Sequence, residues 1–185
     1  MAAQYVIEDL VRIPVRVELA SEFRYRRPIL DPNGLVVIIS QSGETADSLA
    51  ALREAKKMGI QTLAIVNVVG SSIAREADNV FYTLAGPEIS VATTKAYSTQ
   101  LIAAYVLAIQ FAFVKNTITE EQYSGYIEEL QTIPDKIRKI IEDKERLQWF
   151  AAKQANAKDV FFVGRGIDYA ICLEGSLKMK EISYI

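Results

Sequence analysis

The feature that most constrains the fold is a repeated alternation of short β-branched runs and helical segments. The run LVVIIS at 35–40 is apolar throughout, which is typical of a strand buried on both faces in a parallel sheet. A helix is predicted over 44–58, with Gly59 as its C-terminal cap. The pattern then repeats, with strands at 61–67 and 79–84 and helices near 71–77 and 91–115. It predicts an α/β fold, a doubly wound parallel β-sheet flanked by helices.

The segments outside this alternation suggest a second domain. A helix over 2–12 and a short strand at 15–19 are predicted before the first buried run. Residues 119–157 are predicted to be entirely helical. A strand at 159–164 and a helix from 167 restart the α/β pattern. We therefore expect a first domain over 1–150 and the start of a second, truncated one over 151–185.

The composition excludes several kinds of chemistry. The chain has no histidine and one cysteine, Cys172, so histidine triads, internal disulfides and multi-cysteine metal sites are excluded. We expect no metal, and a single cysteine fits a reducing compartment such as the cytoplasm. The net charge of −2 argues against nucleic acid as a partner. The apolar stretch at 101–114 is shorter than the roughly 20 residues of a membrane span, so no membrane is expected.

The sharpest motif, Ser40-Gln41-Ser42-Gly43-Glu44-Thr45, follows the first buried strand and opens a helix. Ligands bind at the carboxyl ends of parallel strands, and a helix N-terminus attracts anions. Hydroxyl groups add donors there, and the absence of Lys and Arg points to a single phosphate rather than a triphosphate. The alternative is that Ser42 only caps its helix.

A second hydroxyl-rich turn, residues 90–95, follows the third strand of the alternation and contains Thr93, Thr94 and Lys95. Taken alone, this turn is explained more simply by helix capping and a solvated lysine. Two such turns at one edge of a sheet nevertheless point to a polyol phosphate.

The last predicted helix carries Glu174, Lys178 and Glu181 on one face. This spacing is typical of a surface salt bridge. It also fits a carboxylate general base beside a lysine, so both interpretations stay open.

Three longer segments of the chain are distinctive, namely ISQSGETADSLAAL at 39–52, GPEISVATTKAYSTQL at 86–101 and GRGIDYAICLEGSLKMKEISYI at 164–185. Together with EFRYR at 22–26, they resemble the isomerase half of the glutamine–fructose-6-phosphate aminotransferase family. The resemblance implies a sugar isomerase (SIS) domain with a five-stranded parallel sheet. It also implies amination of fructose 6-phosphate and isomerisation to glucosamine 6-phosphate, without metal or organic cofactor.

The resemblance also assigns roles to residues. It implies that Ser42 and Thr45, with Ser40 and Gln41, bind the phosphate and sugar. Further sugar contacts are implied for Val91 and Thr93, which stands where many members have serine, and the implied base is Glu181 with Lys178 as its charged neighbour. Fructose 6-phosphate, glucose 6-phosphate and glucosamine 6-phosphate are the expected ligands.

The resemblance implies that the glutaminase domain, the first strand of the sheet and the ring-opening histidine are missing. We therefore expect a fragment that completes neither the synthase reaction nor the isomerisation, and a homodimer. Strand 159–164 could take the vacant place in the sheet, within one chain or exchanged between two. A non-catalytic sugar-phosphate-binding module and an inert folding fragment remain as alternative interpretations.

Overall fold

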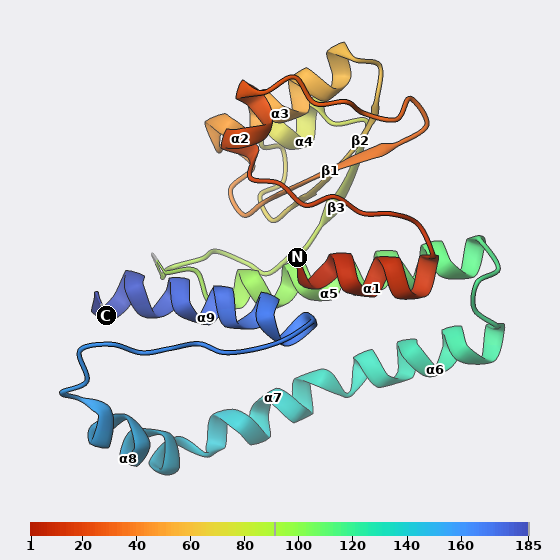
Figure 1. The fold of residues 1–185 in the computed structure, drawn as a ribbon. Helices are drawn as coiled ribbons and strands as arrows, with labels where there is room; N and C mark the ends of the chain where they lie inside the picture. The colour runs from red at the N-terminus through yellow and green to blue at the C-terminus, as the bar shows by residue number, and fades with distance from the viewer. Residues whose placement is uncertain (91, 185) are drawn as a thin grey trace. The chain divides into compact units, whose positions relative to one another are not determined.

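The computed structural model describes residues 1–90 and 92–184. The chain forms two compact units, drawn in Figure 1. Val15–Ala104 make up one, here called the sheet unit. Met1–Pro14 and Tyr105–Ile185 make up the other, here called the helical unit.

The sheet unit is built on three parallel strands. They are β1 (Leu35–Ser40), β2 (Gln61–Val66) and β3 (Asn79–Tyr82), in the order β1-β2-β3. Leu35 lies opposite Gln61 in the first pair, and Leu63 opposite Asn79 in the second. The helices of this unit are α2 (Ala20–Tyr25), α3 (Ala46–Lys57), α4 (Ser72–Glu76) and the first residues of α5 (Lys95–Val114). The α/β prediction is confirmed, and the described residues supply three of the five strands that the resemblance implied.

The core of the sheet unit lies between the strands and three of these helices (Figure 1). The face of α3 that carries Ala51, Leu52 and Ala55 is almost completely buried. It packs with Phe23 from α2 and Ile73 from α4. Burial of this apolar stripe fixes α3 on the strands, and the start of α3 therefore stays at the carboxyl end of β1.

Two strand predictions need correction. The first is that β1 is buried on both faces, whereas Leu35, Val37 and Ile39 are 43%, 40% and 46% exposed. β1 is an edge strand with helices on one face, and the central strand β2 is the one buried along nearly its whole length. The strand predicted at 15–19 is also wrong, because these residues pair with no strand in the described sheet. β-branched side chains favour a strand only where a neighbouring strand is available.

Asp78 joins the beginnings of β2 and β3. Its carboxylate accepts hydrogen bonds from the backbone N–H and hydroxyl of buried Thr62, at 2.9 and 2.8 Å, and pairs with Lys56 at 2.7 Å. The hydrogen bond from Lys56, followed by those from Thr62, lowers the pKa of Asp78 to about 2.

The contacts of Asp78 with Thr62 and Lys56 predict a loss of stability in acid. Because the folded-state pKa of about 2 lies below the unfolded value of 3.8, the stabilisation is complete above pH 3.8 and disappears as the pH falls through 2. The urea midpoint of the wild type should therefore fall over this window more steeply than that of Asp78→Asn, measured by circular dichroism. Parallel pH profiles for the two proteins would contradict the assignment.

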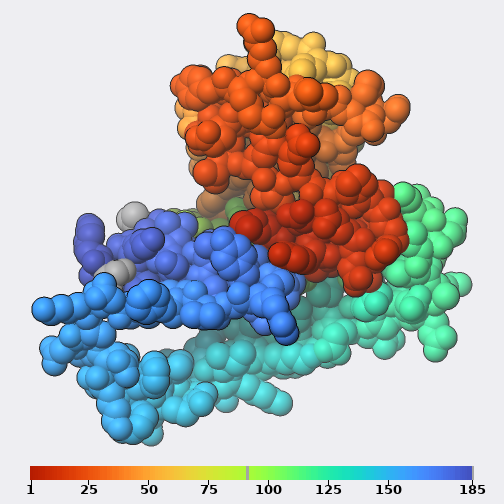
Figure 2. All heavy atoms as spheres, viewed as in Figure 1, coloured from red at the N-terminus to blue at the C-terminus, as the bar shows by residue number. Residues whose placement is uncertain are grey.

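The helical unit is organised around α1 (Ala2–Val11) and α5. Val11 packs against Ala108 and Ala112 of α5, all three fully buried, and the Thr117 hydroxyl donates to the Leu10 carbonyl at 2.6 Å. The other helices are α6 (Glu120–Gln131), α7 (Ile133–Glu142), α8 (Lys144–Gln154) and α9 (Ile167–Ser183), and α9 packs against α1. None of α6, α7 and α8 buries a residue, and Figure 2 shows their open surface in green to blue.

The segment 159–164 is not a strand, and its predicted insertion into the sheet of the same chain is wrong. These residues are unpaired, and the described sheet ends at β1 and β3. The segment instead packs on α9, where a Cβ on Gly175 would lie 2.9 Å from the Phe162 ring. This contact leaves most of the segment uncovered, since Phe161 and Val163 are 88% and 86% exposed. Exchange of this segment between two chains stays a prediction.

Helix α5 lies within the helix predicted over 91–115, but its apolar character extends beyond the stretch at 101–114. It runs for 20 residues and, by length and hydropathy alone, meets the requirement for a membrane span. Core helices of soluble proteins meet it as well. Ala103, Ala104, Ala108, Ile109 and Ala112 of α5 are buried within the protein.

Candidate functional site

The loop 40–45 at the carboxyl end of β1 is braced by its own hydroxyl groups. Ser40 is 6% exposed, and its Oγ accepts a hydrogen bond from the Gly43 N–H at 3.1 Å. The same Oγ lies 3.2 Å from Thr45 Oγ1. The Ser40 hydroxyl therefore makes its contacts within the loop. Ser40 would affect a bound ligand by fixing the shape of the loop.

Gly43 brings the loop against the start of α4. Its φ of +68° lies in the left-handed region, and an added Cβ would lie 2.1 Å from Ser71 Oγ. The Gly43 carbonyl accepts a hydrogen bond from the Ile73 N–H at 3.0 Å. Both the backbone conformation and the close approach require glycine at this position.

Two hydroxyl-bearing residues of the loop are exposed at the N-terminus of α3. Ser42 and Thr45 are both exposed, and Ser42 Oγ accepts from the Glu44 N–H at 3.2 Å, which leaves its O–H free to donate. Thr45 is the N-cap residue of α3, but its side chain makes no capping hydrogen bond. The first turn of this 12-residue helix thus presents N–H groups and the positive end of its dipole beside two hydroxyls.

The acidic residues near this helix start are paired elsewhere. Glu44 accepts a hydrogen bond from the Ser72 N–H of α4 at 2.7 Å. Hydrogen bonding with the side chain of Ser72, and then with its backbone, lowers the pKa of Glu44. Asp47 in the first turn of α3 pairs with Arg24 of α2 at 2.7 Å. The loop itself contains no basic residue, and Arg24, which α2 brings close to the start of α3, was not predicted. The only sequence signal for Arg24 was the EFRYR segment at 22–26.

Two buried polar atoms at or below the loop have unused hydrogen-bonding capacity. Gln41 Oε1 and Ser71 Oγ are enclosed and have no hydrogen-bond partner among the described residues. An unpaired buried polar atom costs about 1–3 kcal/mol. The backbone of Gln41, by contrast, is fixed, because its carbonyl accepts from the Asn67 N–H at 3.3 Å.

The second hydroxyl-rich turn differs from the first because a carboxylate already occupies the start of its helix. Glu88 accepts hydrogen bonds from the backbone N–H groups of Ser90, Thr94 and Ala96 at 3.3, 3.3 and 3.4 Å. Burial raises the pKa of Glu88, but these three bonds outweigh it and lower the pKa. Thr93 is half-buried with a φ of +45°, and Val91 lies outside the described residues.

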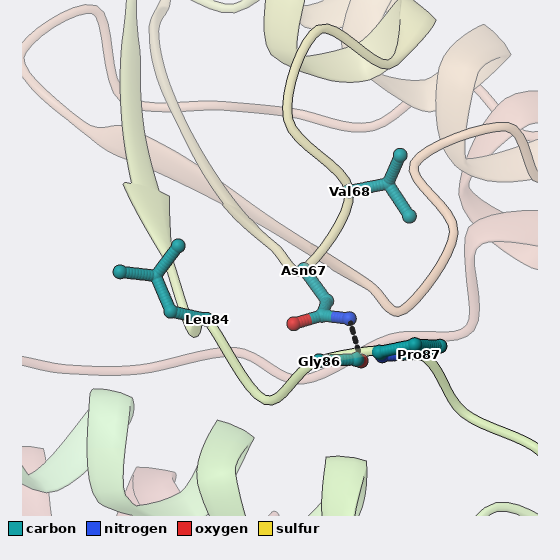
Figure 3. A pocket seen from close by; sticks show the side chains of 5 residues that line it. All are labelled: Asn67, Val68, Leu84, Gly86 and Pro87. Carbon is teal, nitrogen blue, oxygen red and sulfur yellow. Dashed lines mark hydrogen bonds between the residues drawn. The ribbon is translucent and has the colours of Figure 1, made fainter.

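A small apolar pocket lies at the carboxyl ends of β2 and β3 (Figure 3). Asn67 closes one side of it by donating to the Gly86 carbonyl at 2.7 Å and accepting from the Ala85 N–H at 2.7 Å. Its lining residues are Asn67, Val68, Leu84, Gly86 and Pro87. Asn67, which the sequence analysis missed, therefore holds the chain that leads from β3 to Glu88.

The candidate catalytic pair belongs to α9, in the helical unit. Lys178 Nζ lies 2.7 Å from Glu181 Oε2 and 3.6 Å from Glu174 Oε1. The hydrogen bond to Glu181 is the main reason why the pKa of Lys178 is raised. The Glu181 side chain is 40% exposed, so its carboxylate can reach a ligand while the lysine holds it in place. The predicted spacing on one helix face is confirmed, and the predicted catalytic role remains a prediction.

The charged clusters do not resemble a metal centre. Among residues 1–90 and 92–184, no group of three or more His, Cys, Asp or Glu side chains could hold a metal ion. The polar groups around the loop are hydroxyls, amides and backbone N–H groups, which suit an anion rather than a cation.

Comparison with known proteins finds relatives that are similar to this chain over its whole length. The chain is 58% identical over 185 residues to the isomerizing glutamine–fructose-6-phosphate aminotransferase of Clostridium tetani and 57% identical to that of Caldanaerobacter subterraneus. It covers 30% of the length of each. The solved C-terminal domain of glucosamine-fructose-6-phosphate aminotransferase from Francisella tularensis superposes with a TM-score of 0.97 at 43% identity, over all of this chain and 52% of that one.

A more distant structure shares the fold. Glucosamine-6-phosphate deaminase from Thermotoga maritima superposes with a TM-score of 0.75 at 24% identity, over 99% of this chain and 54% of that one. The SIS domain profile matches residues 1–110, which include all three strands and both hydroxyl-rich turns. With more than half of its length matched and the parallel sheet in place, the chain belongs to the SIS domain family.

Proposed function

We propose that the chain is the isomerase part of a glutamine–fructose-6-phosphate aminotransferase and that it binds sugar phosphates through the loop 40–45. Homology over all 185 residues to enzymes of that name supports the assignment, although the chain spans 30% of their length. The assignment of the phosphate site rests on a difference in capping between the N-termini of α3 and α5. The side chain of Thr45 leaves α3 uncapped, whereas Glu88 caps α5.

The proposed roles follow from what each group can donate. Ser42 and Thr45 would hold the phosphate with the first-turn N–H groups of α3, and Ser40 and Gln41 would shape the loop around it. Thr93, together with Val91, would contact the sugar. The ligands proposed are fructose 6-phosphate, glucose 6-phosphate and glucosamine 6-phosphate.

Isomerisation between these ketose and aldose phosphates requires a proton to move between C1 and C2. Glu181 is the proposed base, because a carboxylate can take the proton from one carbon and return it to the other. Lys178, 2.7 Å away, would orient that carboxylate and stabilise its charged form. The proposed chemistry uses no metal or organic cofactor.

Three other expectations are part of the same proposal and remain predictions. They are a homodimer, a cytoplasmic location, and the division of the chain into a first SIS domain over 1–150 and the start of a second over 151–185. The names of the relatives support a sugar-phosphate protein and do not state its assembly.

Calorimetric titration with glucose 6-phosphate and with glucose tests the phosphate site. Glucose 6-phosphate should bind and glucose should not. Ser42→Ala should weaken binding about tenfold to a hundredfold, the usual effect of losing one hydrogen bond to a charged group. Ser124→Ala, an exposed hydroxyl in α6, is the matched control and should bind like the wild type. Equal binding of glucose, or equal loss in both variants, would contradict the proposal.

A further inference from the structure

The segment between β3 and α5 is held at both ends by side chains that form hydrogen bonds with its backbone. At its beginning, Asn67 Oδ1 accepts from the Ala85 N–H and Asn67 Nδ2 donates to the Gly86 carbonyl. At its end, Glu88 accepts from Ser90, Thr94 and Ala96. Such bonds fix a loop that has no regular secondary structure of its own.

Two non-glycine residues of this segment have strained backbones, and each adjoins one of these attachments. Leu84 has a φ of +51° and precedes Ala85, while Thr93 has a φ of +45° and precedes Thr94. The left-handed region costs roughly 1–2 kcal/mol for a residue with a side chain, and a β-branched residue such as Thr93 fits it poorly. Conformations of this kind persist only where the surroundings enforce them.

We propose that Glu88 is a positioning residue that holds the turn carrying Thr93 in its strained conformation, and so sets the sugar side of the site without contributing to the phosphate side. The inference rests on the proposed function for its ligand and on the hydrogen bonds of Glu88 for its geometry. Removal of the carboxylate would release the N–H groups of Thr94 and Ala96, and Thr93 could then relax to a negative φ.

The charge of Glu88 also determines which of the two helix starts receives the phosphate of the ligand. A carboxylate at the N-terminus of α5 satisfies the N–H groups that would otherwise attract an anion and repels a second negative charge. The phosphate is thereby directed to the uncapped start of α3, and the uncharged sugar is left for the Thr93 turn. Glu88 thus distinguishes two helix starts that look alike in sequence.

The geometric part is tested by amide hydrogen exchange on the whole chain. In Glu88→Ala, protection of the Thr94 and Ala96 amides should fall at least about tenfold, because their acceptor is lost. Glu88→Gln keeps one carbonyl oxygen and should give an intermediate result. Glu128→Ala, an exposed carboxylate of α6, is the control and should leave these amides unchanged. Unchanged protection in Glu88→Ala would overturn the inference.

The ligand part is tested by titration with glucose 6-phosphate and with inorganic phosphate. Glu88→Ala should weaken glucose 6-phosphate binding about tenfold and leave the affinity of the loop 40–45 for inorganic phosphate within about twofold of the wild type. Equal losses for both ligands would overturn the inference, because they would indicate general damage rather than a change on the sugar side. If the wild type binds neither ligand, the proposed function fails, and amide exchange still reports separately on the Glu88 geometry.

Discussion

Gly43→Ala is expected to abolish phosphate binding, with a loss of at least about a hundredfold. The new Cβ would lie 2.1 Å from Ser71 Oγ and 2.6 Å from Ser71 Cβ, inside any permissible contact. The loop would have to leave α4, and the hydrogen bonds from the Gly43 N–H and to its carbonyl would be lost together. Calorimetry with glucose 6-phosphate measures the effect.

Two companion variants separate the collision from the backbone strain. Gly59→Ala has a similar φ of +75° with open space around it, so it should reduce stability by roughly 1–2 kcal/mol and leave binding intact. Ser71→Gly removes both atoms that collide with the new Cβ, so Gly43→Ala with Ser71→Gly should recover part of the affinity. Full binding by Gly43→Ala alone would contradict the described loop.

Glu181→Gln is expected to reduce proton exchange at C2 of glucose 6-phosphate by about 100-fold to about 10,000-fold while affinity stays close to that of the wild type. The amide cannot accept the proton, but it preserves the size of the side chain. Incorporation of deuterium from heavy water, followed by nuclear magnetic resonance, measures this partial reaction without requiring amination or complete turnover.

Glu174→Gln is the matched control, because Glu174 lies on the same helix face and also pairs with Lys178, at 3.6 Å. It should exchange the C2 proton nearly as fast as the wild type. Equal losses in the two variants would show that Glu181 acts only through the Lys178 ion pair. Binding of the sugar phosphate with no exchange in the wild type would favour the non-catalytic binding module over a base in this chain.

The three strands of the described sheet were predictable because each carries its signal within a few residues. The runs at 35–40, 61–67 and 79–84 became β1, β2 and β3 with small changes at their ends. Strands 15–19 and 159–164 were predicted on the same local grounds and were wrong. Their composition suits a strand, but pairing depends on a neighbour that local sequence does not reveal. The exposure of Val37 and Ile39 has the same origin, since an edge position is a property of the whole sheet.

In the candidate site, too, some features follow from the local sequence, whereas others depend on contacts between distant segments. The position of Ser42 and Thr45 at a helix start after a strand follows from the motif itself. The contacts of Arg24 with Asp47, and of Ser71 with Gly43, join segments far apart in sequence and could not be read from spacing. Glu88 is near its partners, but a glutamate six and eight residues before the amides it binds matches no common capping pattern.

The central claim is that the loop 40–45 and the start of α3 hold the phosphate. The most direct test is a titration of the isotope-labelled chain with glucose 6-phosphate, following each backbone amide by nuclear magnetic resonance. The largest shifts are expected at the amides of 42–48, with smaller shifts at Thr93 and none for glucose at the same concentration. Shifts centred on Thr94 and Ala96 would place the anion at α5 instead, and no shifts at millimolar glucose 6-phosphate would contradict a phosphate site in this chain.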